Sequence, residues 1–341
     1  PLATGLDVEA VAETGAVAFV AALTGYPGDS YEYFYRYDAE HLPIPACYVR
    51  GSDGAWLDER LAEGPVRVTL VARADFDEVE TYNVIGELPG ADDEVVIVGS
   101  HHDGPWASAV EDGTGIALVL AQARYWAAQP EADRPHRMIF VLHAAHMAGW
   151  PGQAVFIDSL GDTIDATVLE VHLEHAAREF VEEDGELVDT GLCTPRWLFT
   201  SPNLVLHESV YEALQAEGLA RSLILPPDVI DGRPPTDGVG YYDRGVPIVN
   251  LLGAPFYLFD AMDTMDKVDD ENLVAITITD QPEYEGPPLP EVRRTIVPFS
   301  TEGAIRREME LTIDQDPRTK RFEYGFNKLP YWQTRPSLAA R

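Results

Sequence analysis

Three strongly apolar segments, separated by helical patterns, most constrain the fold of this chain. VVIVGS (95–100) is a continuous apolar run of the kind that lies buried on both faces of a parallel sheet, RMIFVL (137–142) predicts another buried strand, and ATVLEVHLE (166–174) predicts a third. Helical patterns lie between them, at 113–128 and near 152–160. This alternation of strands and helices predicts an α/β fold with a mixed, mostly parallel sheet flanked by helices.

The segments on either side of this unit extend it and suggest domain boundaries. Downstream, the pattern recurs with a helix near 208–218 and strands at 221–226 and 246–253. The α/β material upstream is too short for an independent domain, and the Pro-rich, charged C-terminal part is typical of an extension over the surface or onto a partner subunit. We therefore expect an N-terminal α/β segment (1–75), a central domain (76–280) and a C-terminal extension (281–341) through which a homo-oligomer could form.

Composition excludes several classes of partner. The chain has 24 Lys and Arg against 58 Asp and Glu, a net charge of −34, so it lacks the clustered cations that nucleic acid binding needs. No apolar stretch approaches the roughly 20 residues of a membrane helix, so we expect no membrane partner. Cys47 and Cys193 are too few for a disulfide framework or a Cys-based zinc site, although one bridge stays open. The sequence begins at Pro1 without a signal pattern, so we expect a processed chain or a fragment and assign no compartment.

Six of the nine histidines form three pairs at predicted strand ends: HHD (101–103), HAAH (143–146) and HLEH (172–175). In open α/β sheets, ligands bind at the carboxyl ends of the strands. Acidic residues accompany the pairs, at Asp103, Glu111, Asp112 and Glu174. Burying so many ionisable groups is costly unless they are paired or coordinate a metal. The pattern predicts a metal site, with a buried network of histidines and carboxylates as the alternative.

At these residues the chain resembles the M28 metallopeptidases, whose members include zinc aminopeptidases with a co-catalytic pair of metal ions. VVIVGSHHDG resembles the strand of that family that ends in a His-x-Asp motif, ASAVEDGTGIALVL resembles the acidic motif after it, and VHLEH resembles the strand with a further carboxylate ligand. TDGVGYYDRGVPIVNL and FYLFDAMDTMDKV resemble the two late motifs, and GAVAFV through VRVTLVA is similar to half of a protease-associated domain. The resemblance implies His101, Glu111 and Glu174 as metal ligands. We place Asp103 among the catalytic residues, as the carboxylate that orients His101.

Three positions depart from the pattern of the family. His146 and Met147 stand where the family has a general base followed by a ligand glutamate, and Phe259 stands at a ligand histidine. Gly238 replaces another usual histidine. Since a thioether is a poor partner for zinc, two ligands of the same ion are lost. The resemblance then implies one bound ion instead of two.

Two explanations of this loss stay open. Degeneration would leave a catalytically dead binding domain, whereas rebuilding into a mononuclear site predicts new ligands nearby, which the extra histidines favour. His146 can serve as a base or as an additional ligand. His172 shares a strand face with Glu174, whereas His175 faces away unless the strand has ended. The further candidates, as ligands or as hydrogen-bond partners of ligands, are His102, Asp112, His172 and His175.

A substrate pocket is expected beside the metal. Met147 and Phe259 would form an apolar wall where the second ion is lost, and Tyr241 and Tyr242 would line the pocket unless they belong to an ordinary aromatic core. A sphere of His and carboxylate ligands suits zinc, and equally suits iron(II) or manganese(II). Zinc is the metal that the resemblance implies.

The leading hypothesis is a metal-dependent hydrolase that acts on an amide or other C–N bond of a small molecule or peptide. A bound ion would make water nucleophilic and polarise a carbonyl. The alternatives are a non-hydrolytic metal enzyme, such as an iron enzyme or a lyase, on the same scaffold, and a non-catalytic binding domain. The chain has no GxSxG motif and no Gly-rich phosphate loop, so serine-hydrolase and nucleotide-dependent chemistry have no support.

Overall fold

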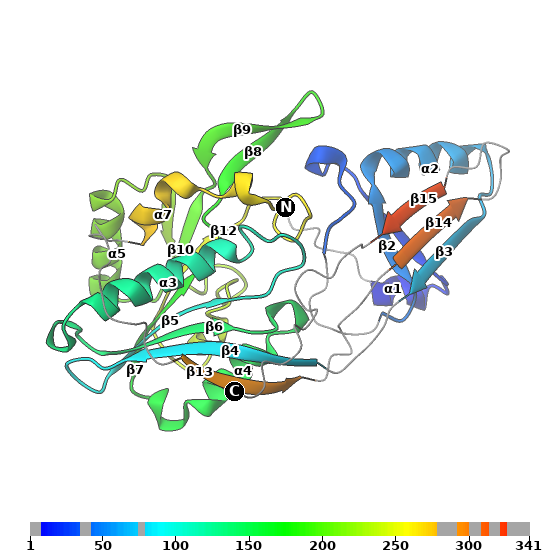
Figure 1. The fold of residues 1–341 in the computed structure, drawn as a ribbon. Helices are drawn as coiled ribbons and strands as arrows, with labels where there is room; N and C mark the ends of the chain where they lie inside the picture. The colour runs from blue at the N-terminus through cyan, green and yellow to red at the C-terminus, as the bar shows by residue number, and fades with distance from the viewer. Residues whose placement is uncertain are drawn as a thin grey trace, which may run out of the picture.

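An eight-stranded sheet organises the chain in the computed structural model (Figure 1), which describes residues 8–34, 42–73, 79–277, 292–299, 308–313 and 321–325. Its strands, in spatial order, are β11 (Ser222–Leu225), β10 (Arg196–Thr200), β12 (Ile248–Gly253), β7 (Thr167–Leu173), β5 (Val95–His101), β6 (Arg137–His143), β4 (Val79–Leu88) and β13 (Val292–Phe299). The central strands β6, β5, β7 and β12 pair in parallel. On one side β4 is antiparallel to β6 and β13 is antiparallel to β4, and on the other side β10 is antiparallel to β12. The predicted mixed, mostly parallel sheet is confirmed.

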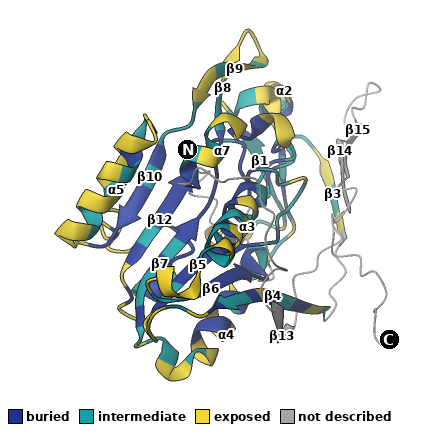
Figure 2. Cartoon of the chain, turned by 60° about the vertical axis from the view of Figure 1, so that its left-hand side comes forward, coloured by how far each residue is buried: buried dark blue, intermediate teal, exposed yellow. Residues whose placement is uncertain are grey.

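Side chains of the central strands alternate between two apolar cores. On β6, Met138, Phe140 and Leu142 belong to one buried cluster, and Ile139 and Val141 belong to the other. Successive residues of a strand point to opposite faces of the sheet, so a strand that is apolar throughout needs a cover on both faces. Figure 2 shows these strands buried between helices whose outer faces are exposed.

The helices supply those two covers. Residues of α3, α5 and α7 pack into the first cluster, and residues of α4 and α6 pack into the second. The bounds are α3 (Gly113–Ala128), α4 (Pro151–Ser159), α5 (Leu204–Ala216), α6 (Val239–Tyr242) and α7 (Asp270–Ile276). Asp112 caps α3, because its side chain accepts a hydrogen bond from the Gly115 N–H at 3.1 Å. The cap fixes the loop that carries Glu111 at the edge of the sheet.

Smaller elements lie beside the main sheet. In the N-terminal part, β1 (Phe19–Leu23) and β2 (Ala46–Arg50) pair in parallel, with α1 (Val8–Glu13) before them and α2 (Gly51–Glu63) after. β3 (Val68–Arg73) forms a three-stranded sheet with β14 (Glu308–Ile313) and β15 (Arg321–Gly325). Short 3-10 helices occur at η1 (Pro27–Asp29), η2 (Glu131–Asp133), η3 (His146–Ala148), η4 (Gly161–Thr163) and η5 (Met265–Lys267). Strands of the C-terminal part therefore pair both with the N-terminal part and with the main sheet.

A projecting hairpin was not predicted. The strands β8 (Arg178–Glu183) and β9 (Glu186–Cys193) pair in antiparallel fashion and extend away from the main sheet (Figure 1). None of their residues is fully buried, and the sequences REFVEE and ELVDTGLC lack the alternation of apolar and polar residues that marks a half-buried strand. Cys47 and Cys193 are both free, so no disulfide joins them. None of the helices in the described ranges has the length and apolar character that a membrane span requires.

A buried ion pair joins β10 to the start of α7. Arg196 Nη2 lies 2.6 Å from Asp269 Oδ2, and the two side chains are only 4% and 5% exposed. Removing one partner of a buried pair leaves the other charge without compensation, which costs about 3–5 kcal/mol. Asp269→Ala should therefore lower the free energy of unfolding by that amount in urea titrations of the full chain.

The exposed pair of Arg233 and Asp243 provides the control, since its side chains are 60% and 43% exposed. Exposed pairs contribute about 0–1 kcal/mol, so Asp243→Ala should leave the unfolding midpoint almost unchanged. Equal effects of the two substitutions would contradict the prediction.

Candidate metal centre

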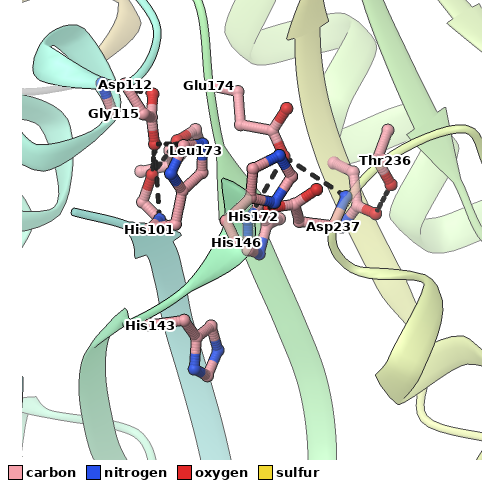
Figure 3. A network of polar contacts seen from close by, with 12 residues as sticks. His101, Asp112, Gly115, His143, His146, His172, Leu173, Glu174, Thr236 and Asp237 are labelled. Carbon is pink, nitrogen blue, oxygen red and sulfur yellow. Dashed lines mark hydrogen bonds and ion pairs between the residues drawn. The ribbon is translucent and has the colours of Figure 1, made fainter. Parts of the chain in front are cut away.

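The predicted polar residues gather where the central parallel strands end (Figure 3). His101 is the last residue of β5, while Glu174 and His175 directly follow β7. Glu111 comes from the loop before α3, and Asp237 comes from the loop before α6. His143 ends β6 but turns away, because its Nε2 lies 2.9 Å from the Tyr241 hydroxyl in the core. Segments that are far apart in the sequence thus share one edge of the sheet.

Four histidines of this edge are held in the same manner. Each has its Nδ1 beside an acceptor oxygen, and each directs its Nε2 toward Glu111 or Glu174. The Nδ1 contacts are His101 with Asp103 O (2.8 Å), His146 with Asp237 Oδ2 (2.6 Å), His172 with Glu170 Oε1 (2.9 Å) and His175 with Gly253 O (2.7 Å). Metal-binding histidines are almost always oriented in this way, by a carboxylate or a backbone carbonyl on the second ring nitrogen.

Glu111 is the carboxylate on which three of these rings converge. Its Oε1 lies 3.3 Å from His101 Nε2 and 3.8 Å from His146 Nε2, and its Oε2 is in direct contact with His175 Nε2. Burial favours a raised pKa for Glu111, yet His175 and His101 hold the pKa well below its ordinary value. Glu111 Oε2 and His175 Nε2 thus place a carboxylate oxygen and a ring nitrogen side by side in a buried position. Such buried atoms are suited to coordinating a cation.

Glu174 is the second carboxylate of the centre and has its own nitrogen neighbours. Its Oε1 lies 3.2 Å from His172 Nε2 and accepts a hydrogen bond from the Asp237 backbone N–H at 3.3 Å. Burial raises the pKa of Glu174, and the nearby Asp237 carboxylate raises it further. Burial lowers the pKa of His172, but the hydrogen bond to Glu170 and the negative charges of Glu170, Glu174 and Asp237 together raise it to about 9. His172, Glu174 and Asp237 are close enough to share an ion, as are His101, Glu111 and His146.

His175 takes part because β7 has ended before it. The strand stops at Leu173, and His175 has a positive φ of 52°, which turns its side chain back toward Glu111 and Glu174. Burial lowers the pKa of His175, but Glu111 raises it to about 10. The sequence predicts that His175 faces away unless the strand has ended before it, and the strand has ended.

Two aspartates hold the loops that carry these side chains. Asp103 accepts hydrogen bonds from the backbone N–H groups of His146 at 3.0 Å and Met147 at 2.8 Å. Its backbone carbonyl oxygen lies 2.8 Å from His101 Nδ1, and its carboxylate lies 3.8 Å from the same nitrogen, so the carbonyl is the nearer of the two contacts that orient this ring. Asp263 accepts from Val110 N–H at 2.9 Å and from Glu111 N–H at 2.8 Å.

Two further candidate ligands are engaged in other contacts. His102 turns to the opposite face of the strand end, and its Nε2 lies 2.7 Å from the Tyr82 carbonyl oxygen. The Asp112 side chain is used by the cap of α3 and by a close contact with the Ser100 hydroxyl. His102 is thus not placed to bind an ion, and Asp112 supports the loop that holds Glu111.

Asp237 and Trp150 are site residues that the sequence did not predict. Burial favours a raised pKa for Asp237, but His146 holds the pKa well below its ordinary value. Trp150 Nε1 donates to the same His146 Nδ1 at 2.5 Å. One nitrogen cannot accept from an indole and donate to a carboxylate together, so the two contacts belong to alternative tautomers of His146. Asp237 precedes Gly238 in the TDGVG segment, and its place in that motif was the sequence feature that could have identified it as a site residue.

A cavity of about 890 Å³ opens over the centre. Glu111, His146, Glu174, His175 and Asp237 form its polar wall. Aromatic and apolar side chains form much of the remainder, among them Trp150, Trp197, Pro234, Phe256 and Phe259. The cavity can therefore take a ligand with an apolar part next to the polar centre.

Of the four residues expected to line the pocket, Phe259 does so. Tyr241 and Tyr242 do not, because they pack into the core cluster under α4, so the alternative of an aromatic core is the correct one. Met147 also lies outside the lining, since consecutive residues of a helical turn point in different directions and His146 takes the position toward the cavity.

Comparison with known proteins agrees with this fold. Residues 83–280 match the family model described as Peptidase family M28. A curated relative, leucine aminopeptidase 2 of Arthroderma otae, is 29% identical over 130 residues, which cover 37% of this chain and 25% of the relative.

Two solved structures share the fold. A zinc aminopeptidase from Bacillus subtilis gives a TM-score of 0.56 with 15% identity, over 80% of this chain and 64% of that chain. A peptidase M28 precursor from Shewanella amazonensis gives 0.54 with 21% identity, over 83% and 64%. The chain thus spans a quarter of the curated relative and less than two thirds of either structure. Because the family model matches more than half of its residues, the chain belongs to peptidase family M28.

Proposed function

We propose that this chain is a metal-dependent hydrolase that cleaves an amide or other C–N bond of a peptide or small molecule. The observation that carries the proposal is the convergence of four tethered histidines on two buried carboxylates. Membership of the M28 family supports a divalent metal at this position. Zinc is our first choice because a zinc aminopeptidase shares the fold, and iron(II) or manganese(II) suits the same donors.

The proposed centre is mononuclear and rebuilt. We propose His101, Glu111, Glu174 and His146 as the residues that would hold the ion. His175 contacts both carboxylates and would fix them relative to each other. Phe259 lines the cavity at the position of a lost ligand, which supports a single ion at this place.

Other residues of the chain would orient the ligands and hold the substrate. When bound, the ion would lower the pKa of water to about 7 and polarise a carbonyl group. The Asp237 carboxylate at His146 Nδ1 favours the tautomer with its proton on Nδ1, which leaves the lone pair of Nε2 free. Trp150 and Trp197 would hold an apolar part of the substrate and exclude water from the centre.

Several narrower statements belong to the same proposal. The substrate is a peptide or a small molecule, as peptidase relatives imply, and neither nucleic acid nor a membrane is a partner. The division at residues 75/76 and 280/281, the likeness of the N-terminal segment to a protease-associated domain and a homo-oligomer through residues 281–341 also remain proposals. Much of 281–341 lies outside the described residues.

The test is metal analysis followed by assays of the loaded chain. The full chain loaded with zinc and dialysed should retain one ion, because the proposed ligands are buried side chains that the fold already holds close together. Removing the ion with phenanthroline should reduce turnover on aminoacyl and amide substrates to background, and added zinc should restore it. A chain that retains no zinc would refute the proposal.

An exposed trio offers a matched control. His136 Nδ1 lies 2.9 Å from Asp92 Oδ1 and 3.5 Å from Glu94 Oε2, and these residues could also attract a cation. His136→Ala should leave zinc content and turnover unchanged. Retained zinc without turnover would favour a binding domain, and non-hydrolytic turnover with iron(II) would favour the iron enzyme or lyase.

A further inference from the structure

A carboxylate that the proposed reaction does not use lies deep in the main sheet. Glu170 of β7 is 0% exposed. Burying a carboxylate is costly unless it is paired and hydrogen-bonded. Its Oε1 lies 2.9 Å from His172 Nδ1, and its Oε2 accepts a hydrogen bond from Asn250 Nδ2 at 2.9 Å. Both carboxylate oxygens are therefore engaged, and one of them holds a histidine of the centre.

The geometry of β7 brings this carboxylate to the site. Glu170, His172 and Glu174 alternate along the chain, so all three point to the same side of the strand. On the neighbouring strand β12, Asn250 stands directly opposite His172 in the parallel register. A continuous row therefore runs from the interior of the sheet to the cavity.

Asn250 is itself fixed by the loop before α6. Thr236 Oγ1 donates to Asn250 Oδ1 at 2.5 Å. A Cβ added at Gly238 would lie 2.1 Å from the same Asn250 oxygen, so this position has no room for a side chain. The glycine that replaces a usual histidine of the family is thus required by the amide that supports Glu170.

Glu170 determines how the His172 ring is turned. His172 Nε2 lies 3.2 Å from Glu174 Oε1 but has no hydrogen-bond partner among the residues that the structure describes. The hydrogen bond on Nδ1 is then the polar contact that sets the rotation of the ring. If the ring rotated, Nε2 would leave Glu174, and the Glu174 carboxylate would lose a positive neighbour on that side.

We propose that Glu170 and Asn250 are positioning residues that hold His172 against Glu174 and thereby fix the Glu174 carboxylate for metal binding. The inference rests on the proposed function for the presence of the ion. It assigns to His172 the role of a support for Glu174 and not that of a ligand. Hydrogen-bond partners of ligating carboxylates act in this way in many metal sites.

The experiment compares zinc affinity and kinetics of the full-length chain and its variants. Glu170→Gln keeps the shape of the side chain and removes its charge. It should weaken zinc binding by about 10–100-fold, the usual effect of losing such a support, and it should lower kcat more than it raises KM. Glu87→Gln is the control, because Glu87 lies in the same sheet and pairs with Arg137 at 2.9 Å away from the centre. Unchanged zinc affinity in Glu170→Gln would overturn the proposal and leave the proposed function standing.

A second pair of variants separates positioning from ligation and from loss of folding. His172→Leu should weaken zinc binding, and His172→Gln should restore part of it, because an amide N–H can stand beside the Glu174 carboxylate where leucine offers no polar group. Wild-type chains that bind two zinc ions, one of which is lost in His172→Leu, would make His172 a ligand and overturn the positioning role.

The imidazole N–H resonance of His172 in nitrogen-labelled protein gives a readout without metal. Glu170→Gln should shift or remove this resonance if Glu170 orients the ring. Wild-type chains that bind no zinc would refute the proposed function, and an unchanged resonance would refute the positioning.

Discussion

Replacing Glu111 with glutamine is expected to abolish tight zinc binding at the centre. Three histidine rings face this carboxylate, and His101 Nε2 and His175 Nε2 are the nearest of its nitrogen neighbours. A neutral amide would leave these rings without the anion that they share, and it would offer the ion a weaker donor. The loss should exceed the roughly 100-fold that removal of an outer partner costs, and hydrolysis should disappear with it.

Competition with a chromophoric chelator measures this loss directly. Glu94→Gln serves as the control, because Glu94 belongs to the exposed trio and carries the same chemical change. A Glu111→Gln chain that binds zinc as tightly as the wild type would exclude Glu111 as a ligand. The network of histidines and carboxylates would then be a purely structural feature of the edge of the sheet.

Much of the fold could be predicted because the central strands are buried on both faces. The segment at 138–142 is apolar at every position, because Phe140 packs into one core and Val141 into the other. An apolar run of this kind involves neighbouring residues only, so it can be recognised in the sequence without knowledge of the fold. The strands β8 and β9 lack such a pattern, because their side chains meet solvent and are not selected for alternation.

The members of the site could be predicted where they end strands or belong to motifs. His101 Nε2 lies 3.3 Å from Glu111 Oε1, and His175 contacts both Glu111 and Glu174, so these side chains share the edge of the sheet where parallel strands end. Asp237 was missed because it reaches Glu174 from a loop 63 residues away. No periodicity relates two such positions.

The orientation of single side chains was harder to predict than their place. His175 depended on where β7 ends, and one residue more of strand would have turned it away from Glu111. Tyr241 belongs to the core because α6 presents it to α4, which is a tertiary contact without a local signal. Glu170 has no sequence signal of its own among the residues of β7. Its contact with Asn250 depends on the register that places Asn250 opposite His172.

His146→Ala is the substitution that assigns the residue at the position of the family's general base. Its Nε2 lies 3.8 Å from Glu111 Oε1, and its ring stacks on His101 with centroids 4.1 Å apart. Its Nδ1 is held by Asp237 at 2.6 Å, as in a histidine that binds a metal. These contacts favour the role of ligand, so we expect zinc affinity and turnover to fall together.

A base at this position would give a different result. Zinc content would then remain unchanged while turnover fell by about 10²–10⁴-fold, which is the usual contribution of general acid–base catalysis. His102→Ala is the matched control, because His102 is a neighbouring histidine that hydrogen-bonds to Tyr82 outside the centre, and both quantities should stay at wild-type values. If His146→Ala leaves zinc affinity and turnover unchanged, His146 has neither role. The ion would then depend on His101, Glu111 and Glu174, and hydrolysis would proceed without either a ligand or a base at position 146.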